Sequence, residues 1–353
     1  MKKCGIITFH YIPNFGAILQ AFALYKSIHD LGIDVEIIDY RCENLDKREL
    51  SSIGSDRLIK KIYQSIFIEP NRKNKIEGCN KFISKYAKTS NEEYRHDKVG
   101  KLTQQYSTIV LGSDMIWNED ITNDDETYLG NFLKRHSIIA SYAASGLQEL
   151  NDIWLNTISS CLRNMDYISV REFTAKELLQ KYSDKPIHVS LDPTLLIDGN
   201  EWGKYIQKPK YENYVLVYFP DKNLIEAAGK FAVTHHLKLL VIDNGLSLQG
   251  YKKIWPVTPG EWLGLIYYSS AVFTNSYHGV IFSILFHKLF WSNNNGERQH
   301  SLLDCLGLIN ANLNNDKALQ NNINYQVVEQ ILLEKRKTSL AYLRGVFDVE
   351  HDK

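Results

Sequence analysis

Residues 4–31 have the sequence CGIITFHYIPNFGAILQAFALYKSIHDL. An apolar run at 5–9 is followed by a short polar loop, and then by apolar residues spaced three and four apart over 17–31. The first pattern is typical of a buried β-strand, and the second of a helix with one buried face. The opening of the chain therefore predicts a strand, a loop and a helix, the unit from which parallel sheets are built.

The same alternation continues along two further stretches of the chain. The first stretch predicts strands at 35–40, 108–111, 138–143, 167–170 and 188–191, with a helix at 174–182. The second predicts strands at 214–218, 238–243, 271–274 and 289–291, with helices at 223–236, 259–269 and 280–286. Strands that alternate with helices favour parallel sheets covered on both faces. The predicted fold class is α/β, with two doubly wound, Rossmann-like halves.

A chain of 353 residues is longer than one hydrophobic core usually spans. We therefore expect two domains facing a cleft, the kind of place where ligands bind. The first domain is expected over 1–195 and the second over 196–325, with a hinge in the polar stretch 199–210. A helix within 326–353 is expected to pack back on the first domain.

Composition excludes several classes of protein. Hydrophobic residues at 44% and charged residues at 23% are usual for globular chains. Lysine plus arginine and aspartate plus glutamate both number 41, so the positive field used by nucleic-acid binders is absent. The five cysteines are scattered, which predicts reduced thiols in the cytoplasm. No apolar run approaches a membrane span, and the N-terminus lacks the small-residue site of a signal peptide.

Residues 50–80 form a basic insertion with an amphipathic pattern. Six basic side chains at 57–75 surround apolar residues at 58–68. One interpretation is a solvated helix packed on the first domain. The other is peripheral contact with an anionic membrane surface, which would place the protein at the inner face of the membrane.

Polar segments that follow predicted strands are the first candidates for a site, since ligands of parallel sheets bind beyond the carboxyl ends of the strands. The first such segment contains Asn14, Gly16 and Gln20. Backbone N–H groups at the start of the following helix suit an anionic or hydroxyl-rich ligand. The alternative is that Asn14 and Gly16 serve the geometry of the turn.

The second segment, GSDMIWN at 112–118, follows the apolar strand 109–111. Asp114 is placed to orient or deprotonate a hydroxyl, and Trp117 offers a flat apolar face of the kind against which sugars pack. In the alternative interpretation, Ser113 or Asp114 caps a helix and Trp117 lies in the core.

The remaining segments supply cationic groups. Arg171 follows a strand and is placed to grip a carboxylate or phosphate with two parallel hydrogen bonds, unless it forms a surface pair with Glu172. His278 lies between the strand 271–274 and the helix 280–286, where it serves as an acid, a base, an anion binder or a structural residue. Arg298 is a further cation near the start of a predicted helix.

Taken together, these segments resemble the polysaccharide pyruvyl transferase family. The matching motifs are NFGA at 14–17, LQ at 19–20, GSD…WN at 112–118, SYAAS at 141–145, VRE at 170–172, DPT at 192–194 and TNSYHG at 274–279. The likeness extends over about residues 4–308 and implies the GT-B arrangement of two Rossmann-like domains. The chain departs from the family at Met115 and Ile116, where Gln-Val is frequent, and at Gly146, where an aromatic residue is frequent. The first departure bears on acceptor choice.

The resemblance implies transfer of the pyruvyl group of phosphoenolpyruvate onto two sugar hydroxyls, to form a ketal in cell-surface or exopolysaccharide biosynthesis. The expected acceptor is a sugar nucleotide, a lipid-linked sugar or a polysaccharide. The second domain is expected on the donor side and the first on the acceptor side. No metal or cofactor is expected, because no histidine or carboxylate cluster has ligand spacing.

The resemblance also assigns roles to residues. His278 and Asp114 are expected to be catalytic: His278 as the acid or as the group that stabilises charge on phosphate, and Asp114 as the base that orients a hydroxyl. The expected donor-binding residues are Arg171, His278, Ser276 and Arg298, and the expected acceptor-binding residues are Asn14, Gly16, Gln20, Trp117 and Asn118.

Two alternatives stay open from the sequence. The same two-domain shell hosts glycosyltransferases that use a nucleotide sugar, because a fold does not fix a function. A non-catalytic glycan-binding protein is the other. The sequence predicts no particular oligomeric state.

Overall fold

The computed structural model describes residues 3–50, 69–131, 137–147, 151–242, 251–293, 296–311 and 323–347. The chain divides into two compact units. The first unit contains the described residues of 1–52, 80–196 and 333–353, and the second those of 53–79 and 197–332. The chain therefore passes from one unit to the other after Leu196, and residues 333–347 belong to the first unit.

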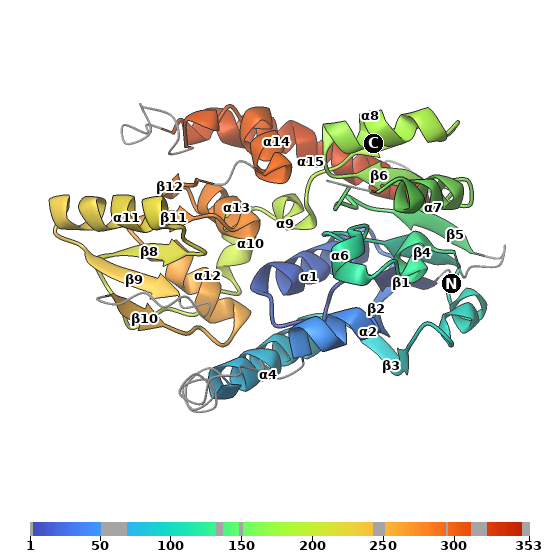
Figure 1. Ribbon diagram of the computed structural model, residues 1–353, viewed down its shortest axis with the longest axis horizontal. Helices are drawn as coiled ribbons and strands as arrows, with labels where there is room; N and C mark the ends of the chain where they lie inside the picture. The colour runs from blue at the N-terminus through green and yellow to red at the C-terminus, as the bar shows by residue number, and fades with distance from the viewer. Residues whose placement is uncertain are drawn as a thin grey trace. The chain divides into compact units, whose positions relative to one another are not determined.

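The first unit is built on a parallel sheet of five strands, in the order β3-β2-β1-β4-β5 (Figure 1). The strands are β1 (Lys3–Ile7), β2 (Asp34–Tyr40), β3 (Thr89–Tyr94), β4 (Thr108–Leu111) and β5 (Ile138–Ser141). A further parallel pair, β6 (Ile168–Val170) and β7 (Ile187–Val189), continues beside β5 through single bridges of Ala140 with Tyr167 and of Ala144 with Val170. The polar side chains that follow β4 to β7 therefore gather at one edge.

Helices cover both faces of this sheet. The longer ones are α1 (Phe15–His29), α7 (Asp152–Leu162) and α8 (Phe173–Leu179), together with the parts of α4 (Glu69–Tyr86) and α15 (Tyr325–Phe347) that start at 80 and at 333. The short ones are α2 (Glu43–Leu45), η1 (Asp46–Leu50), η3 (Val99–Lys101), α5 (Leu102–Gln105), α6 (Glu119–Thr122), η4 (Glu126–Leu129), η5 (Gln180–Tyr182) and α9 (Pro193–Leu196). Leu24 of α1 and Leu343 of α15 belong to the core on one face, and Trp154 of α7 to the core on the other.

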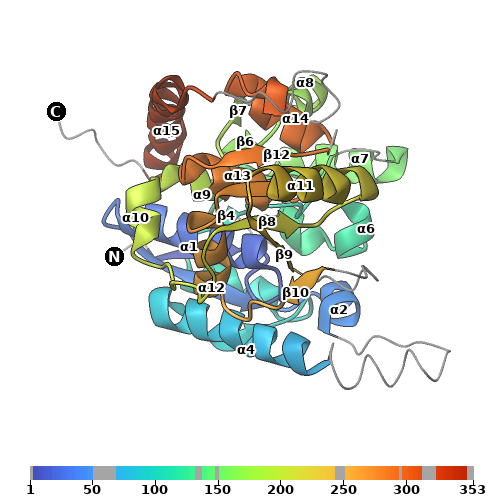
Figure 2. The ribbon, with the colours of Figure 1, turned by 90° about the vertical axis from the view of Figure 1, so that its left-hand side faces the viewer.

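The second unit repeats the plan with a parallel sheet in the order β10-β9-β8-β11-β12. Its strands are β8 (Tyr214–Tyr218), β9 (Lys238–Ile242), β10 (Lys252–Ile254), β11 (Ala271–Thr274) and β12 (Leu289–Trp291). Its helices are α10 (Gly199–Gly203), α11 (Lys222–Thr234), α12 (Pro259–Tyr267), α13 (Tyr277–Leu285), α14 (Glu297–Cys305) and η6 (Ile309–Ala311). Helix α11 packs on one face of the sheet, and α12 lies on the other side (Figures 1 and 2).

The strand order fixes where a ligand can bind in each unit. In both sheets the chain moves outward from the central strand in one direction and then crosses to the other side. The order therefore reverses between β1 and β4 in the first unit, and between β8 and β11 in the second. Such a reversal leaves a crevice beyond the carboxyl ends of the two strands, and ligands of doubly wound sheets bind there.

The predicted α/β class with parallel sheets is confirmed. The edge strands β3 and β10 were not predicted, because TSNEEY and KKI are polar and short. In the C-terminal helix, Leu343 and Val346 are buried in the core of the first unit, and the Tyr342 hydroxyl donates to the Ser141 carbonyl at 2.7 Å. The end of α15 therefore packs on the first unit.

The basic insertion is only partly described. Residues 51–68, which include most of the predicted amphipathic pattern, lie outside the described residues. The described remainder of the insertion lies in α4, and its residues 69–79 belong to the second unit, whereas the solvated-helix interpretation placed the insertion on the first domain. The end of α4 belongs to the first unit, where Phe82 packs edge-on against Phe22 of α1 at 5.4 Å between ring centroids. The membrane interpretation stays a prediction.

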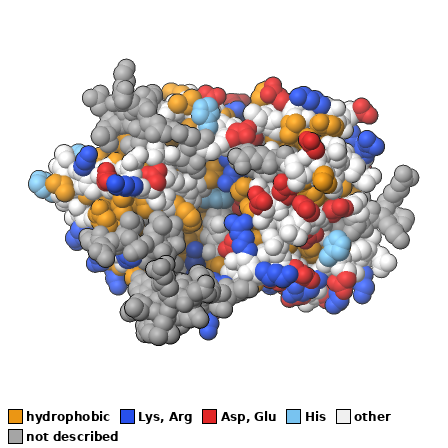
Figure 3. All heavy atoms as spheres, viewed as in Figure 1, with side chains coloured by type: hydrophobic (Ala, Val, Ile, Leu, Met, Phe, Trp, Pro, Cys, Tyr) orange, Lys and Arg blue, Asp and Glu red, His pale blue; other side chains and the backbone are white. Residues whose placement is uncertain are grey.

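Two other sequence predictions concern the thiols and the surface. All five cysteines are free thiols, as predicted, and four of them are buried. Basic and acidic side chains are interspersed over the described part of the face in Figure 3. Among the described residues, no helix is both long and apolar enough to cross a membrane.

Candidate active site

Gln20 joins two loops of the first unit at the point where its strand order reverses. It lies on α1, is fully buried, and donates from Nε2 to Thr8 Oγ1 at 2.8 Å and to the Ala17 carbonyl at 3.0 Å. Its Oε1 accepts from the backbone N–H of Ser113 at 3.2 Å. Gln20 therefore ties the residue after β1 to the loop after β4. The expectation that it contacts an acceptor is corrected, because its amide is buried and engaged within the fold.

Asn14 and Gly16 serve the start of α1. Asn14 is exposed at the N-cap, and its Oδ1 accepts from the backbone N–H of Gly16 at 3.0 Å and of Ala17 at 3.3 Å. These are two of the helix-start N–H groups that the sequence analysis offered to a ligand. The turn interpretation of this segment is therefore supported, and acceptor binding by Asn14 and Gly16 stays a prediction.

The loop after β4 holds Asp114 at the carboxyl edge of the sheet. Asp114 is buried and adopts a left-handed backbone conformation, with φ of 73°. Its Oδ1 accepts from the Met115 N–H at 2.9 Å, and its carbonyl accepts from the Ser145 N–H at 3.0 Å. The loops after β4 and β5 are thus joined, and Asp114 is fixed where a base for a hydroxyl was expected.

Trp117 is a core residue, which corrects the sequence expectation. It has no exposed surface, and its Nε1 donates to the Tyr128 carbonyl at 3.0 Å. It therefore presents no face to a sugar, and the alternative of a core tryptophan is the right one. The neighbouring Asn118 caps α6, where its Oδ1 accepts from the Ile121 N–H at 3.1 Å.

Arg171 is held by a buried ion pair. Its Nη2 lies 2.9 Å from Asp192 Oδ2 and donates to Ser113 Oγ at 2.6 Å. The side chains of Arg171 and Asp192 are 3% and 0% exposed, so the charges can be buried only because they compensate each other. The predicted alternative of a surface pair with Glu172 is wrong. Glu172 is also buried, and instead accepts from Ser145 Oγ at 2.6 Å.

Asp192 is in turn fixed by its own sequence motif. Its Oδ1 accepts from the backbone N–H and the hydroxyl of Thr194, at 2.9 and 2.5 Å. The sequence analysis quoted this Asp-Pro-Thr segment without giving Asp192 a role. Its position directly after a predicted strand was the available signal. The structure thus places a guanidinium at the carboxyl edge of β4 to β7, with its orientation set by Asp192 and Ser113.

The second unit groups three of the predicted donor-binding residues. Ser276 caps α13, where its Oγ accepts from the Gly279 N–H at 3.3 Å. His278 lies in the first turn of the same helix and is 7% exposed. The Arg298 guanidinium lies 5.4 Å from the ring centroid of Tyr277, the residue between the other two. Arg171 belongs to the first unit, so the predicted donor residues come from both units.

In the second unit, polar side chains form a hydrogen-bonded network at the point where the strand order reverses. Asp221, after β8, accepts from the side-chain amides of Asn275 at 3.2 Å and Asn293 at 2.7 Å. Burial raises the pKa of Asp221, but its hydrogen bonds, including that from the Leu224 N–H, lower it overall. The sequence analysis did not assign Asp221 or Asn293 to a site. The network holds the loops after β8, β11 and β12 together, and so positions the start of α13.

The first unit also contains a hollow of about 940 Å³ at the carboxyl ends of β2 and β3. Arg41, Arg95 and His96 are among the side chains that line it. At its rim, Asp39 accepts from Arg41 Nε at 2.6 Å and lies 3.1 Å from His10 Nε2. Burial alone raises the pKa of Asp39, but the hydrogen bonds and charges of His10 and Arg41 outweigh it and lower the pKa to about 2. The sequence analysis missed this hollow.

These features agree with a comparison with known protein families. The model of a family described as polysaccharide pyruvyl transferase matches residues 14–291. The chain belongs to this family. It is therefore a transferase, with Asp114, Arg171, Ser276 and His278 inside the matched region and Arg298 beyond it. No curated protein matched the chain.

Solved structures support the fold assignment of this transferase. MnaA of S. aureus, in a co-structure with UDP, is 11% identical with a TM-score of 0.52, and the match covers 100% of this chain and 99% of that one. UDP-GlcNAc 2-epimerase from Neisseria meningitidis, bound to UDP-GlcNAc, is 9% identical with a TM-score of 0.50, and the match covers 99% of each chain. At these identities the likeness shows the fold alone, which is of the GT-B type.

Proposed function

We propose that this transferase moves the pyruvyl group of phosphoenolpyruvate onto two hydroxyls of a sugar, and so forms a cyclic ketal in cell-surface polysaccharide. Family membership supports pyruvyl transfer. The observation that supports an anionic donor most directly is the buried, oriented guanidinium of Arg171 at the carboxyl edge of the first sheet.

Phosphoenolpyruvate has a carboxylate and a phosphate on one small molecule, so its site needs at least two anion-binding groups. A guanidinium fixed in orientation matches a carboxylate or phosphate with little loss of side-chain freedom. The start of α13 offers a helix N-terminus, with His278 in its first turn and Arg298 close by, and helix N-termini bind phosphate groups. We assign Arg171 of the first unit and the Ser276–His278–Arg298 group of the second unit as anion-binding groups for the donor.

The reaction balances without an oxidant or reductant. A proton is added to the methylene carbon of the donor, while a sugar hydroxyl forms a bond to C2 and gives up its own proton. The bond from C2 to the phosphate oxygen then breaks, and phosphate leaves with the electron pair. A second sugar hydroxyl bonds to C2 and loses its proton, which closes the ketal. The two sugar hydroxyls thus release two protons, which equal the one proton added to the methylene carbon and the one taken up by the leaving phosphate.

General acid and base groups suit these steps, because each moves a proton to or from carbon or oxygen. We assign His278 as the acid that serves the donor, and Asp114 as the base that orients the attacking hydroxyl. Neither assignment needs a metal. Among the residues that the structure describes, no three histidine, cysteine or carboxylate side chains come close enough to hold one.

The test measures phosphate release and ketal formation with phosphoenolpyruvate and three classes of acceptor: a nucleotide sugar, a lipid-linked sugar and a polysaccharide. We expect His278→Gln and Asp114→Asn each to lower the rate by roughly 10² or more. The matched controls are His29→Gln and Asp120→Asn, at exposed positions on α1 and α6, and they should keep the rate. Glycosyl transfer from a nucleotide sugar with no release of phosphate from phosphoenolpyruvate would contradict the proposal.

A further inference from the structure

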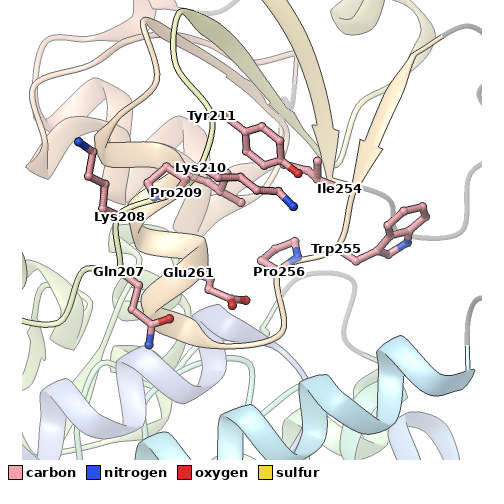
Figure 4. A pocket seen from close by; sticks show the side chains of 10 residues that line it. Gln207, Lys208, Pro209, Lys210, Tyr211, Ile254, Trp255, Pro256 and Glu261 are labelled. Carbon is pink, nitrogen blue, oxygen red and sulfur yellow. The ribbon is translucent and has the colours of Figure 1, made fainter.

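A pocket of about 340 Å³ lies beside the edge strand β10 of the second unit (Figure 4). One wall is the segment from Gln207 to Tyr211, which leads into β8, and another is Ile254–Pro256 at the end of β10. Glu261 and Leu265 of α12 contribute the floor. The volume is at the lower end of the range for pockets that bind small ligands.

The walls of this pocket are set by backbone packing. The Gln207 N–H donates to the Gly260 carbonyl at 3.0 Å. A side chain at Gly264 would overlap the Gln207 carbonyl, so the absence of a Cβ lets the segment lie directly on α12. At the start of α12, Glu261 Oε2 accepts from the Thr258 N–H at 3.3 Å in a capping box, and also from the Val257 N–H at 2.7 Å. The pocket is therefore preformed.

Two aromatic rings line the pocket. Trp255, on its wall, is 39% exposed. Tyr211 adds a half-buried ring inside the pocket. Aromatic side chains are typical of the walls of pockets that bind small molecules. Rings of this kind suit the apolar faces of sugars.

Lysines accompany these rings. Figure 4 shows Lys210 reaching between Tyr211 and Pro256, and Lys208 pointing to the other side of the segment. The ammonium groups of Lys252 and Lys210 lie 5.0 Å and 5.7 Å from the centroid of the Tyr211 ring. Among the described residues that line the pocket, Glu261 carries the carboxylate, and backbone N–H groups at the helix start engage it. The pocket therefore favours a ligand with negative charge.

We propose that this pocket binds an anionic saccharide chain, and that the acceptor of the transferase is an acidic chain of several sugars. The claim that this chain is the acceptor rests on the proposed function, whereas the claim that the pocket binds an anionic saccharide does not. The charge is a carboxylate of an acidic sugar or a phosphodiester within the chain, since both are anions that lysines bind. A concave pocket with polar walls fits such a chain better than it fits a flat membrane surface.

The pocket is separate from the start of α13. Strands β9 and β8 lie between β10 and β11 in the sheet, which puts the two strand axes about 14 Å apart at the usual spacing. The ligand must therefore be longer than one sugar to occupy both places, which is why a chain is inferred.

The test measures binding to the full-length protein by calorimetry, without phosphoenolpyruvate. The probes are an oligogalacturonate, an oligomer of glycerol phosphate, and a neutral dextran oligosaccharide of matched length. We expect at least one anionic probe to bind better than dextran. Trp255→Ala should weaken that binding about tenfold, and Lys210→Gln about threefold. The controls Val233→Ala and Lys230→Gln alter exposed residues of α11 and should leave it unchanged.

Three results would overturn this proposal: neither anionic probe binds, dextran binds equally well, or the Trp255 and Lys210 variants bind like the controls. A separate experiment measures binding to vesicles of phosphatidylcholine and phosphatidylglycerol. Trp255-dependent binding to vesicles but not to oligosaccharides would replace the proposal with a membrane contact. This experiment measures binding and not turnover. Its result can therefore be interpreted even if the protein does not transfer pyruvyl groups.

Discussion

In the buried ion pair of Arg171 and Asp192, the carboxylate holds the guanidinium in the orientation proposed to bind an anion. A guanidinium buried alone would be strongly destabilising, and the carboxylate that compensates it also fixes its direction. Ser113 adds a second constraint from the loop after β4. The donor site proposed here therefore depends on residues that need not contact the donor, and Asp192 is a positioning residue.

Loss of this carboxylate should destabilise the protein. In Asp192→Asn the Arg171 charge stays buried without a compensating charge, and we expect the free energy of unfolding to fall by about 3 kcal/mol or more. Urea unfolding measures the change. The matched control is Asp30→Asn, which breaks the exposed pair of Lys26 and Asp30 and should change the free energy by less than about 0.5 kcal/mol. Equal effects of the two substitutions would contradict this account of the ion pair.

Asp39 should make stability depend on pH in the acid range. Its pKa in the folded protein is about 2, against an ordinary value of 3.8, so the folded state favours the charged form. This contribution, on the order of 2 kcal/mol, is present above about pH 4 and is lost as the pH falls towards 2. Urea midpoints of the parent and Asp39→Asn should therefore differ at neutral pH and converge in acid. A difference that does not vary with pH would be evidence against the His10–Asp39–Arg41 interaction.

At the scale of elements, both sheets place their polar residues by the same rule. Several strands end in a loop whose side chain caps the first turn of the next helix, as Asn14 caps α1 and Ser276 caps α13. The caps explain why these segments have a recognisable sequence. They also explain why a segment that resembles a binding loop includes residues whose task is to start a helix.

The packing of the segment before β8 against α12 gives a prediction about two glycines in helices. Gly264→Ala should destabilise the protein by about 1–3 kcal/mol, because the new methyl group overlaps the Gln207 carbonyl. Gly229→Ala, in the interior of α11, meets no atom within 4 Å and should stabilise it by about 0.5–1 kcal/mol. Thermal unfolding of the two variants checks the opposite signs. Stabilisation by both would show that the segment does not lie on α12 as described.

What the sequence could predict depended on the kind of element. Central strands such as β4 and β11 are continuous apolar runs because both faces are buried, and the sequence predicted them. The edge strand β3 is polar, so its sequence does not differ from that of a loop. Trp117 was ambiguous for a similar reason, since a tryptophan after a polar loop fits both a core and a sugar-binding surface.

Long-range partners were beyond the sequence. Gln20 accepts a hydrogen bond from Ser113, 93 positions away, and Arg171 pairs with Asp192, and no local pattern records either contact. The positions of Arg171, Asp114 and His278 after strands were predictable, because the carboxyl ends of parallel strands share one edge. Their immediate partners needed the fold.

At the scale of the whole molecule, the chain combines two units with the same strand order, and each has polar residues at the point where that order reverses. Asp114 and Arg171 come from the first unit, and Ser276, His278 and Arg298 from the second. The GT-B fold is shared with enzymes that act on sugar nucleotides, so the fold leaves the donor open. The donor is therefore the central claim to test.

The most direct measurement is the thermal midpoint of the purified protein with phosphoenolpyruvate, because a ligand that binds only the folded state raises it. We predict a rise of several degrees at saturating phosphoenolpyruvate, at most a small rise with inorganic phosphate alone, and a much smaller phosphoenolpyruvate effect in Arg171→Lys, which keeps the charge but loses the planar fork. Comparing the ligand-induced rise within each variant separates binding from any loss of stability. No rise with phosphoenolpyruvate, or an equal rise in Arg171→Lys, would contradict the donor site described here.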